Sequence, residues 1–157
     1  MPRKRQFHTV RGYQRQEHGL LTDSMEDYLE MIYRHCIDAD FTRINVLAEQ
    51  LNVQASSATK MVQKLAELGL VEYEKYGLVY LTTAGREQGQ FLFHRHQVVE
   101  QFLAYLGVGE EDLLRETELV EHNISPSTVR KLELLNEFFG ANPDLQRRLR
   151  AFIIEQE

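Results

Sequence analysis

Apolar residues recur every three or four positions through the first half of the chain, a period that predicts helices with one buried face. Three such helices are predicted, over residues 24–36, 43–51 and 55–68. Ser24 would cap the first helix, and Gly69 would end the third. The residues expected on the buried faces of the first and third helices are Met25, Tyr28, Leu29, Ile32, Cys36, Ala58, Met61, Val62, Leu65 and Leu68.

The pattern changes after the third predicted helix to the alternation typical of strands. Residues 70–75 and 78–82 flank Tyr76-Gly77, and this arrangement predicts a β-hairpin. Thr83 would then cap a long helix. The remaining helices are expected over about 84–106 and 110–122, after Ser125-Pro126, and after Asn142-Pro143, since proline favours a first helical position.

The order of these elements predicts a winged helix-turn-helix unit, in a mainly α chain with a small β-hairpin wing. We expect this unit at residues 21–90, a helical domain at 91–157, and a connecting helix over about 84–106. Residues 1–20 show no hydrophobic period and are expected to form a flexible, basic arm.

Charge is unevenly distributed along the 157 residues, whose net charge is −6. Residues 1–20 carry five basic and one acidic residue, whereas residues 21–157 carry 13 basic and 23 acidic ones. An acidic body disfavours nonspecific nucleic-acid binding by the whole surface, and it suggests a metal ion as the counter-charge where carboxylates cluster.

No apolar run approaches the length of a membrane span, and no apolar run follows the basic N-terminus as in a secretory signal. Cys36 is the only cysteine, so an internal disulfide framework and a zinc-ribbon site are excluded. We therefore expect a cytoplasmic protein with no membrane partner.

The predicted helix over 55–68 has the position of a recognition helix, which enters the major groove in helix-turn-helix proteins. Its outward side chains are hydroxyls, amides and ammonium groups, which bond base edges or phosphates. Because residues 43–86 are nearly balanced in charge, a site-specific dimer fits better than a nonspecific binder. The predicted DNA-binding residues are Arg43, Gln54, Ser56, Ser57, Thr59, Lys60, Gln63, Lys64 and Lys75.

Carboxylate and imidazole side chains on three predicted helices suggest a metal site. Within each group the spacing is three or four residues, which places the side chains on one helical face. Four clustered carboxylates would repel one another unless a cation neutralised them. Oxygen and imidazole donors without thiolate suit Mn²⁺ better than structural zinc, and six residues would suffice for two ions. The candidates are Asp27 and Glu30, then His96, and then Glu118, Glu121 and His122.

Other interpretations remain open on the residues alone, because each acidic group by itself is more often a solvated helix face. A binuclear metallohydrolase would also use such donors, but it would need an open coordination position, a substrate pocket and a general base. A winged-helix regulator that responds to a small organic ligand would leave the carboxylates merely solvated.

Several segments together resemble one family, the manganese transport regulators of the diphtheria-toxin-repressor superfamily. The resemblance runs from about residue 22 to about residue 140, in order and in register. The segments that carry it are Ser24-Met25-Glu26-Asp27-Tyr28-Leu29-Glu30, residues 56–65, Tyr73-Glu74-Lys75-Tyr76, Arg95-His96 with Glu100-Gln101-Phe102-Leu103, and Glu118-Leu119-Val120-Glu121-His122.

The resemblance implies a winged helix-turn-helix domain followed by an all-α dimerisation domain. It further implies a binuclear Mn²⁺ site held by the six candidate ligands, with Glu118 and Glu121 bridging. Iron-type members place sulfur ligands in this site, whereas Asp27 and Glu121 are oxygen donors. Asn123 stands where a second histidine is expected.

The expected function is manganese-activated, sequence-specific repression of manganese uptake genes. The expected partners are double-stranded operator DNA and a second copy of the chain, without an organic cofactor and without enzymatic activity. An iron-responsive regulator of the same superfamily is the alternative.

Overall fold

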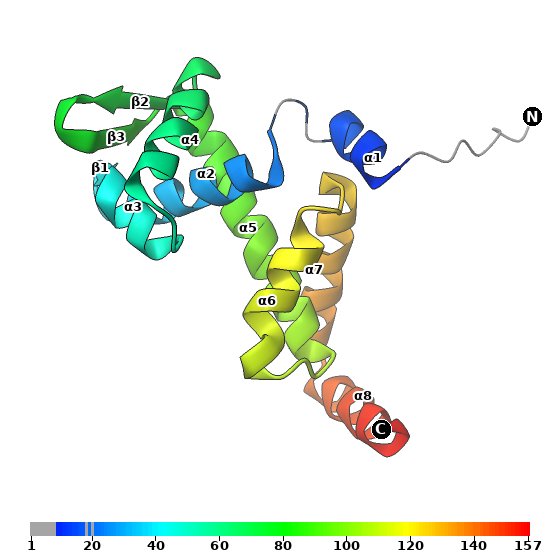
Figure 1. Cartoon of the computed structure of the whole chain (residues 1–157). Coiled ribbons are helices and arrows are strands. Elements are labelled where there is room, and N and C mark those ends of the chain that lie inside the picture. Colours follow the sequence, from blue (N-terminus) through cyan, green and yellow to red (C-terminus); the bar gives the residue numbers. More distant parts are fainter. Residues whose placement is uncertain (1–8, 18, 20) are drawn as a thin grey trace, which may run out of the picture. The chain divides into compact units, whose positions relative to one another are not determined.

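The computed structural model describes residues 9–17, 19 and 21–157, which fold as two compact units (Figure 1). One unit is Thr22–Arg95, and the other contains His96–Glu157 together with the described residues before Leu21 and Leu21 itself. Within the described chain, no helix combines the length and the apolarity that crossing a membrane requires.

The unit Thr22–Arg95 combines a helix-turn-helix with a three-stranded sheet, which confirms the predicted mainly α fold with a small wing. Its core is formed by apolar side chains of α2, α3 and α4 together with the strand residue Val79. Its elements are α2 (Asp23–His35), β1 (Phe41–Arg43), α3 (Ile44–Gln50), α4 (Ala55–Glu67), β2 (Val71–Glu74), the 3₁₀ turn Lys75–Gly77, β3 (Leu78–Leu81) and the first part of α5 (Thr83–Tyr105).

Two helix caps differ from the prediction by one or two residues. The hydroxyl of Thr22, not that of Ser24, accepts the Met25 N–H at 3.3 Å, so α2 begins one turn earlier than expected. Likewise Thr82, not Thr83, accepts the Gly85 N–H at 3.0 Å before α5. Neighbouring hydroxyls compete for one capping position, and only the backbone conformation decides between them.

The sheet contains one strand more than the sequence predicted. β1 pairs antiparallel with β3, with Thr42 opposite Val79, and β2 pairs with the other edge of β3. Only three residues make up β1, so its pattern was too short to separate from the start of the next helix. The predicted hairpin itself is confirmed, with its turn at Lys75–Gly77.

Two glycines let α5 approach its neighbours closely within this unit. A Cβ atom on Gly85 would lie 1.8 Å from the backbone oxygen of Leu70, and one on Gly89 would lie 2.7 Å from the Cβ of Tyr33. Both contacts are too short for real atoms, so any side chain at either position would displace α5.

We expect Gly85→Ala to destabilise the unit by about 2–3 kcal/mol, because the backbone around Leu70 would have to move. Urea unfolding followed by circular dichroism measures this. Gly109→Ala is the control, since open space surrounds its Cβ position, and it should change stability by less than about 0.5 kcal/mol. Equal effects of the two variants would contradict the close approach.

The second unit contains the helices predicted for the end of the chain. They are the last part of α5, α6 (Glu110–Glu121), α7 (Pro126–Ala141) and α8 (Pro143–Gln156). Ser125 caps α7 by accepting the Thr128 N–H at 3.3 Å, with proline in the first turn as predicted. Buried Val99, Leu103 and Val129 pack in this unit.

The N-terminal segment differs from the expected arm, because residues Val10–Glu17 form a helix, α1. Thr9 caps it by accepting the Gly12 N–H at 3.2 Å. Arginines and glutamines interrupt the apolar positions of α1, which explains why no period was visible. The part of the predicted arm at residues 1–8, 18 and 20 lies outside the described chain.

Candidate metal centre and DNA-binding face

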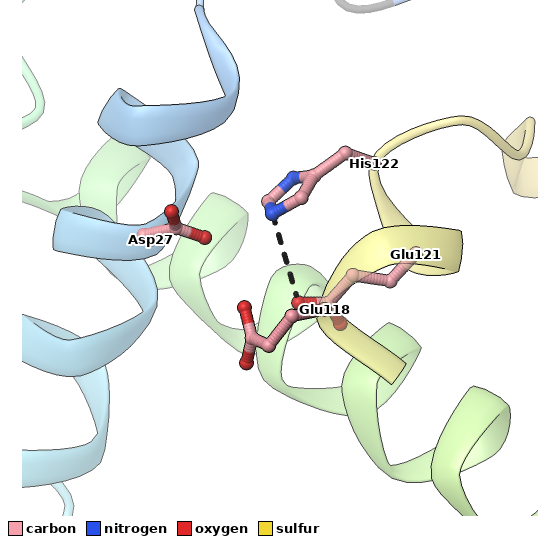
Figure 2. Close-up of side chains that lie close together, drawn as sticks. All are labelled: Asp27, Glu118, Glu121 and His122. Carbon is pink, nitrogen blue, oxygen red and sulfur yellow. Dashed lines mark ion pairs between the residues drawn. The ribbon is translucent and has the colours of Figure 1, made fainter. Parts of the chain in front are cut away.

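The end of α6 brings three predicted ligands together. Glu118, Glu121 and His122 each offer one donor atom, and these atoms lie within 4.8 Å of one another. The i, i+3, i+4 spacing explains this, since such residues share a helical face. Figure 2 shows the ion pair between His122 Nε2 and Glu121 Oε1, at 3.9 Å.

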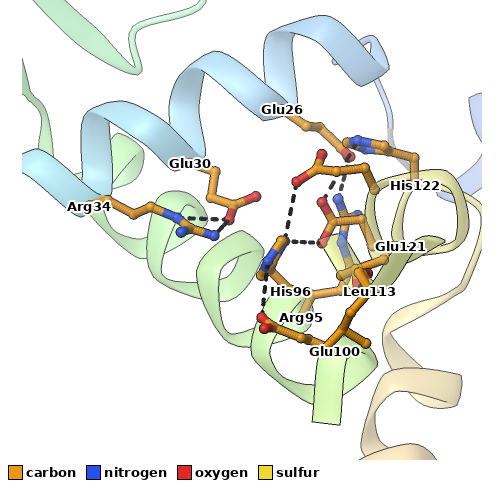
Figure 3. A network of polar contacts seen from close by, with 11 residues as sticks. Glu26, Glu30, Arg34, Arg95, His96, Glu100, Leu113, Glu121 and His122 are labelled. Carbon is orange, nitrogen blue, oxygen red and sulfur yellow. Dashed lines mark hydrogen bonds and ion pairs between the residues drawn. The ribbon is translucent and has the colours of Figure 1, made fainter. Parts of the chain in front are cut away.

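His96 of α5 joins this group in the same unit. Its Nδ1 atom lies 3.2 Å from Glu121 Oε2 and 3.4 Å from Glu118 Oε1, and its Nε2 atom lies 3.3 Å from Glu100 Oε2 (Figure 3). The imidazole of His96 is buried, as is the carboxylate of Glu121. Four of the six predicted ligands therefore lie together. Glu100 is a neighbour that the sequence analysis did not single out.

The environment of Glu121 fits a bound cation. Both of its carboxylate oxygens are buried and accept no hydrogen bond from the described residues. A buried carboxylate without hydrogen-bond donors is costly, and a coordinated cation removes that cost. Carboxylate and imidazole donors suit Mn²⁺. Burial raises the pKa of the Cys36 thiol, so this residue stays protonated and is a poor metal ligand.

The other two predicted ligands lie on α2 in the first unit. Asp27 is half-buried, and Glu30, one turn later, is buried. Arg34 donates to Glu30 from Nη2 at 2.5 Å and from Nε at 3.1 Å, and its guanidinium lies 5.0 Å from the ring centroid of Phe93. That all six residues share one metal centre stays a prediction.

A buried ion pair beside these ligands was missed by the sequence analysis. Arg95 of α5 donates to Glu26 of α2 at 2.7 Å, and their side chains are 1% and 4% exposed (Figure 3). The pair joins residues 69 positions apart, each next to a predicted ligand. One signal pointed to it, because Glu26 is three residues before Leu29 and so borders the apolar face of α2.

The predicted DNA-binding residues of α4 lie mainly on its exposed face. Ala58, Val62 and Leu65 are buried as expected, whereas Met61 and Leu68 are half-exposed. Thr59 is also half-buried, and its hydroxyl donates to the Ala55 carbonyl at 3.0 Å. The exposed members of the predicted set are Gln54, Ser56, Ser57, Lys60, Gln63 and Lys64.

Two further predicted contacts lie outside α4 in the same unit. Arg43, at the end of β1, is exposed and lies 5.7 Å from the ring centroid of Phe41. Lys75 is exposed in the turn of the hairpin. The structure leaves these cations accessible, and their contact with DNA stays a prediction.

Comparison with known proteins identifies the family. Residues 20–79 match the model of the iron dependent repressor N-terminal DNA binding domain, and residues 82–150 match that of the iron dependent repressor metal binding and dimerisation domain. The HTH-type transcriptional regulator MntR of Geobacillus kaustophilus is 42% identical over 130 residues, which cover 83% of this chain and 90% of that protein. The chain belongs to the manganese transport regulators of the diphtheria-toxin-repressor superfamily.

More distant members of the superfamily agree with this. The MntR protein of Bacillus subtilis is 37% identical over 132 residues, covering 84% of this chain and 93% of that protein. The structure of the manganese regulator SloR matches with a TM-score of 0.64 and 30% identity over 74% of this chain. A manganese-dependent transcriptional repressor in complex with manganese matches with a TM-score of 0.61 and 31% identity over 73% of this chain.

This member of the superfamily spans 55% and 53% of the chains in those two structures. It is a metal-dependent transcriptional repressor with a DNA-binding domain, and not an enzyme. The metallohydrolase interpretation is therefore wrong.

Proposed function

We propose that this repressor is activated by Mn²⁺ and then binds operator DNA in front of manganese uptake genes. The observation that carries the proposal is the group His96, Glu118, Glu121 and His122, in the region matched by the metal binding and dimerisation model. Its donors are carboxylates and imidazoles, the chemistry that suits Mn²⁺. Because its target is DNA, the cytoplasm is the proposed location.

The proposed ligand set adds Asp27 and Glu30 of α2 to these four residues. Glu118 and Glu121 would bridge two ions in each subunit. When bound, the ions supply positive charge that neutralises the carboxylates. Asp27 and Glu30 belong to the DNA-binding unit and the other four ligands to the helical unit, so shared coordination would restrict the two units to fewer arrangements.

Activation follows from this restriction if the protein is a homodimer. Two copies of α4 would then enter successive major grooves about 34 Å apart. Ligand residues that hold metal better in the DNA-competent arrangement shift the population toward it. By linkage, DNA must tighten metal binding by the same factor, typically about 1–3 kcal/mol.

Fluorescence anisotropy on chelator-treated protein tests the proposal. The probe is a duplex selected from a random-sequence pool on the Mn²⁺-loaded protein, titrated at fixed salt with Mn²⁺, Fe²⁺, Zn²⁺ or Mg²⁺. Binding that requires Mn²⁺ and fails with Mg²⁺ supports the proposal. Activation by Fe²⁺ but not by Mn²⁺ would favour the iron-responsive alternative, and equal binding without metal would favour a regulator that senses something else.

Lys60→Ala should weaken operator binding about 3- to 10-fold and lower the salt slope by about 0.9, because one phosphate contact releases one counterion equivalent. Lys60 is exposed on α4. Anisotropy over a series of salt concentrations measures both quantities. Lys131→Ala on α7 is the matched control, since that lysine is equally exposed on the other unit. An unchanged affinity and slope for Lys60→Ala would remove it from the interface.

A further inference from the structure

Tyr76 at the tip of the hairpin is the most exposed large apolar side chain of the described residues. It is 90% exposed, whereas the next, Ile154, is 70% exposed. The ring therefore gains almost nothing from packing within the chain. An aromatic side chain held this far into solvent is more typical of a contact surface than of a structural position.

The backbone at Tyr76 is also unfavourable for its residue type. Its φ and ψ angles are 66° and 20°, and Gly77 follows with a φ of 74°. Tight hairpin turns that need positive φ at both positions normally take Asn or Gly first, because a bulky side chain is disfavoured there. The other described residues with positive φ follow that preference: Gly19, Asn52, Gly69, Gly77 and Gly107. The chain thus keeps a residue at this turn that does not stabilise it.

Charge limits which part of the hairpin can approach DNA. Glu72 and Glu74 of β2 are exposed, and their carboxylates would repel phosphates. The turn beyond them, Lys75–Gly77, has no acidic residue. The same compact unit contains α4, which packs against β2 and carries the proposed base and phosphate contacts. The turn is therefore the part of the wing suited to a second contact on the duplex (Figure 1).

We propose that Tyr76 contacts the sugar–phosphate backbone of duplex DNA beside the groove that receives α4. The phenol hydroxyl would donate to a phosphate oxygen, and the ring would lie against the adjacent sugar. An uncharged donor displaces no counterion, so this contact adds affinity that hardly depends on salt. The inference rests on the proposed DNA-binding function and adds a residue to it.

Three variants separate the side chain from the turn. Tyr76→Gly removes the ring and also relieves the positive φ, so it should unfold at a higher urea concentration than the wild type while binding DNA about 3- to 10-fold more weakly. Tyr76→Phe keeps the ring and loses the hydroxyl, and should lie between the two in affinity. Lys75→Ala should instead lower the salt slope by about 0.9. Ile37→Ala is the control, an exposed apolar residue of the same unit.

The measurements are anisotropy over a salt series and hydroxyl-radical footprinting, with the Mn²⁺-loaded full-length protein and the selected duplex. The proposal expects weaker binding by Tyr76→Gly at an unchanged salt slope, and loss of protection at sugars flanking the α4 groove. Unchanged affinity and footprint in a more stable Tyr76→Gly variant would overturn it. If the wild type binds no duplex with Mn²⁺, the proposed function fails first, and the inference fails with it.

Discussion

Replacing Glu121 by glutamine will abolish Mn²⁺-dependent operator binding while making the metal-free protein more stable. Both carboxylate oxygens of Glu121 are buried without a hydrogen bond from the described residues, next to the Nδ1 atom of His96 at 3.2 Å. A neutral amide of the same size costs less to bury, so we expect a gain of about 1–3 kcal/mol without metal. Loss of a charged ligand should weaken Mn²⁺ binding by more than about 100-fold.

The opposite signs of these two effects make the prediction specific. A residue that only supports the fold would lose stability with and without metal when it is changed. Urea unfolding in chelator and in excess Mn²⁺ measures both, because ligand binding to the folded state raises its apparent stability. Glu116→Gln on the same helix is the control, since that carboxylate pairs with exposed Arg115 at 3.0 Å. Wild-type Mn²⁺ affinity in Glu121→Gln would contradict the site assignment.

Periodicity predicted the elements of this chain well where each helix buries a clear stripe. Tyr28, Leu29 and Ile32 of α2 are buried as expected, and so are Ala58 and Val62 of α4. These positions follow from helix geometry alone, because residues three or four apart share a face. The hairpin was equally predictable, since glycine at Gly77 marks a position with positive φ.

The errors arose where local signals are short or ambiguous. The strand β1 has only three residues and is defined by its pairing with β3, which lies more than thirty residues away in the sequence. Periodicity carries no information on such distant pairing. The helix α1 is short, and its stripe is broken by Arg11 and Gly12.

The candidate site shows the same division between local and distant information. Spacing predicted that Glu118, Glu121 and His122 share a face, and the structure confirms it. The placement of His96 beside them required the packing of α5 against α6, which no spacing encodes. Sequence reasoning reached His96 only through the family resemblance.

The ion pair of Glu26 and Arg95 was the largest omission at the site. Charged residues are rarely buried, so a glutamate and an arginine far apart in the sequence give no pattern that predicts burial. Only the three-dimensional arrangement reveals that they meet. The pair then has a structural consequence for the ligands, because it joins α2 next to Asp27 with α5 next to His96.

We expect Arg95→Ala to destabilise the unit Thr22–Arg95 by about 3–5 kcal/mol, since it leaves the Glu26 carboxylate buried opposite a cavity. The two side chains lie 2.7 Å apart and are almost completely buried. Loss of the pair would also loosen α2, which carries Asp27 and Glu30, so Mn²⁺ affinity should fall as well. Urea unfolding of the metal-free protein and isothermal titration with Mn²⁺ measure the two effects.

A double variant distinguishes the buried charge from the shape of the side chains. Glu26→Gln combined with Arg95→Met keeps similar volumes and removes both charges, so stability should return to within about 1 kcal/mol of the wild type. Mn²⁺ affinity should recover in parallel if the pair acts by holding α2 in place on α5. Recovery of stability without recovery of affinity would instead mean that the charge of Glu26 or Arg95 acts on the metal centre directly. An Arg95→Ala variant as stable as the wild type would refute the structural role of the pair.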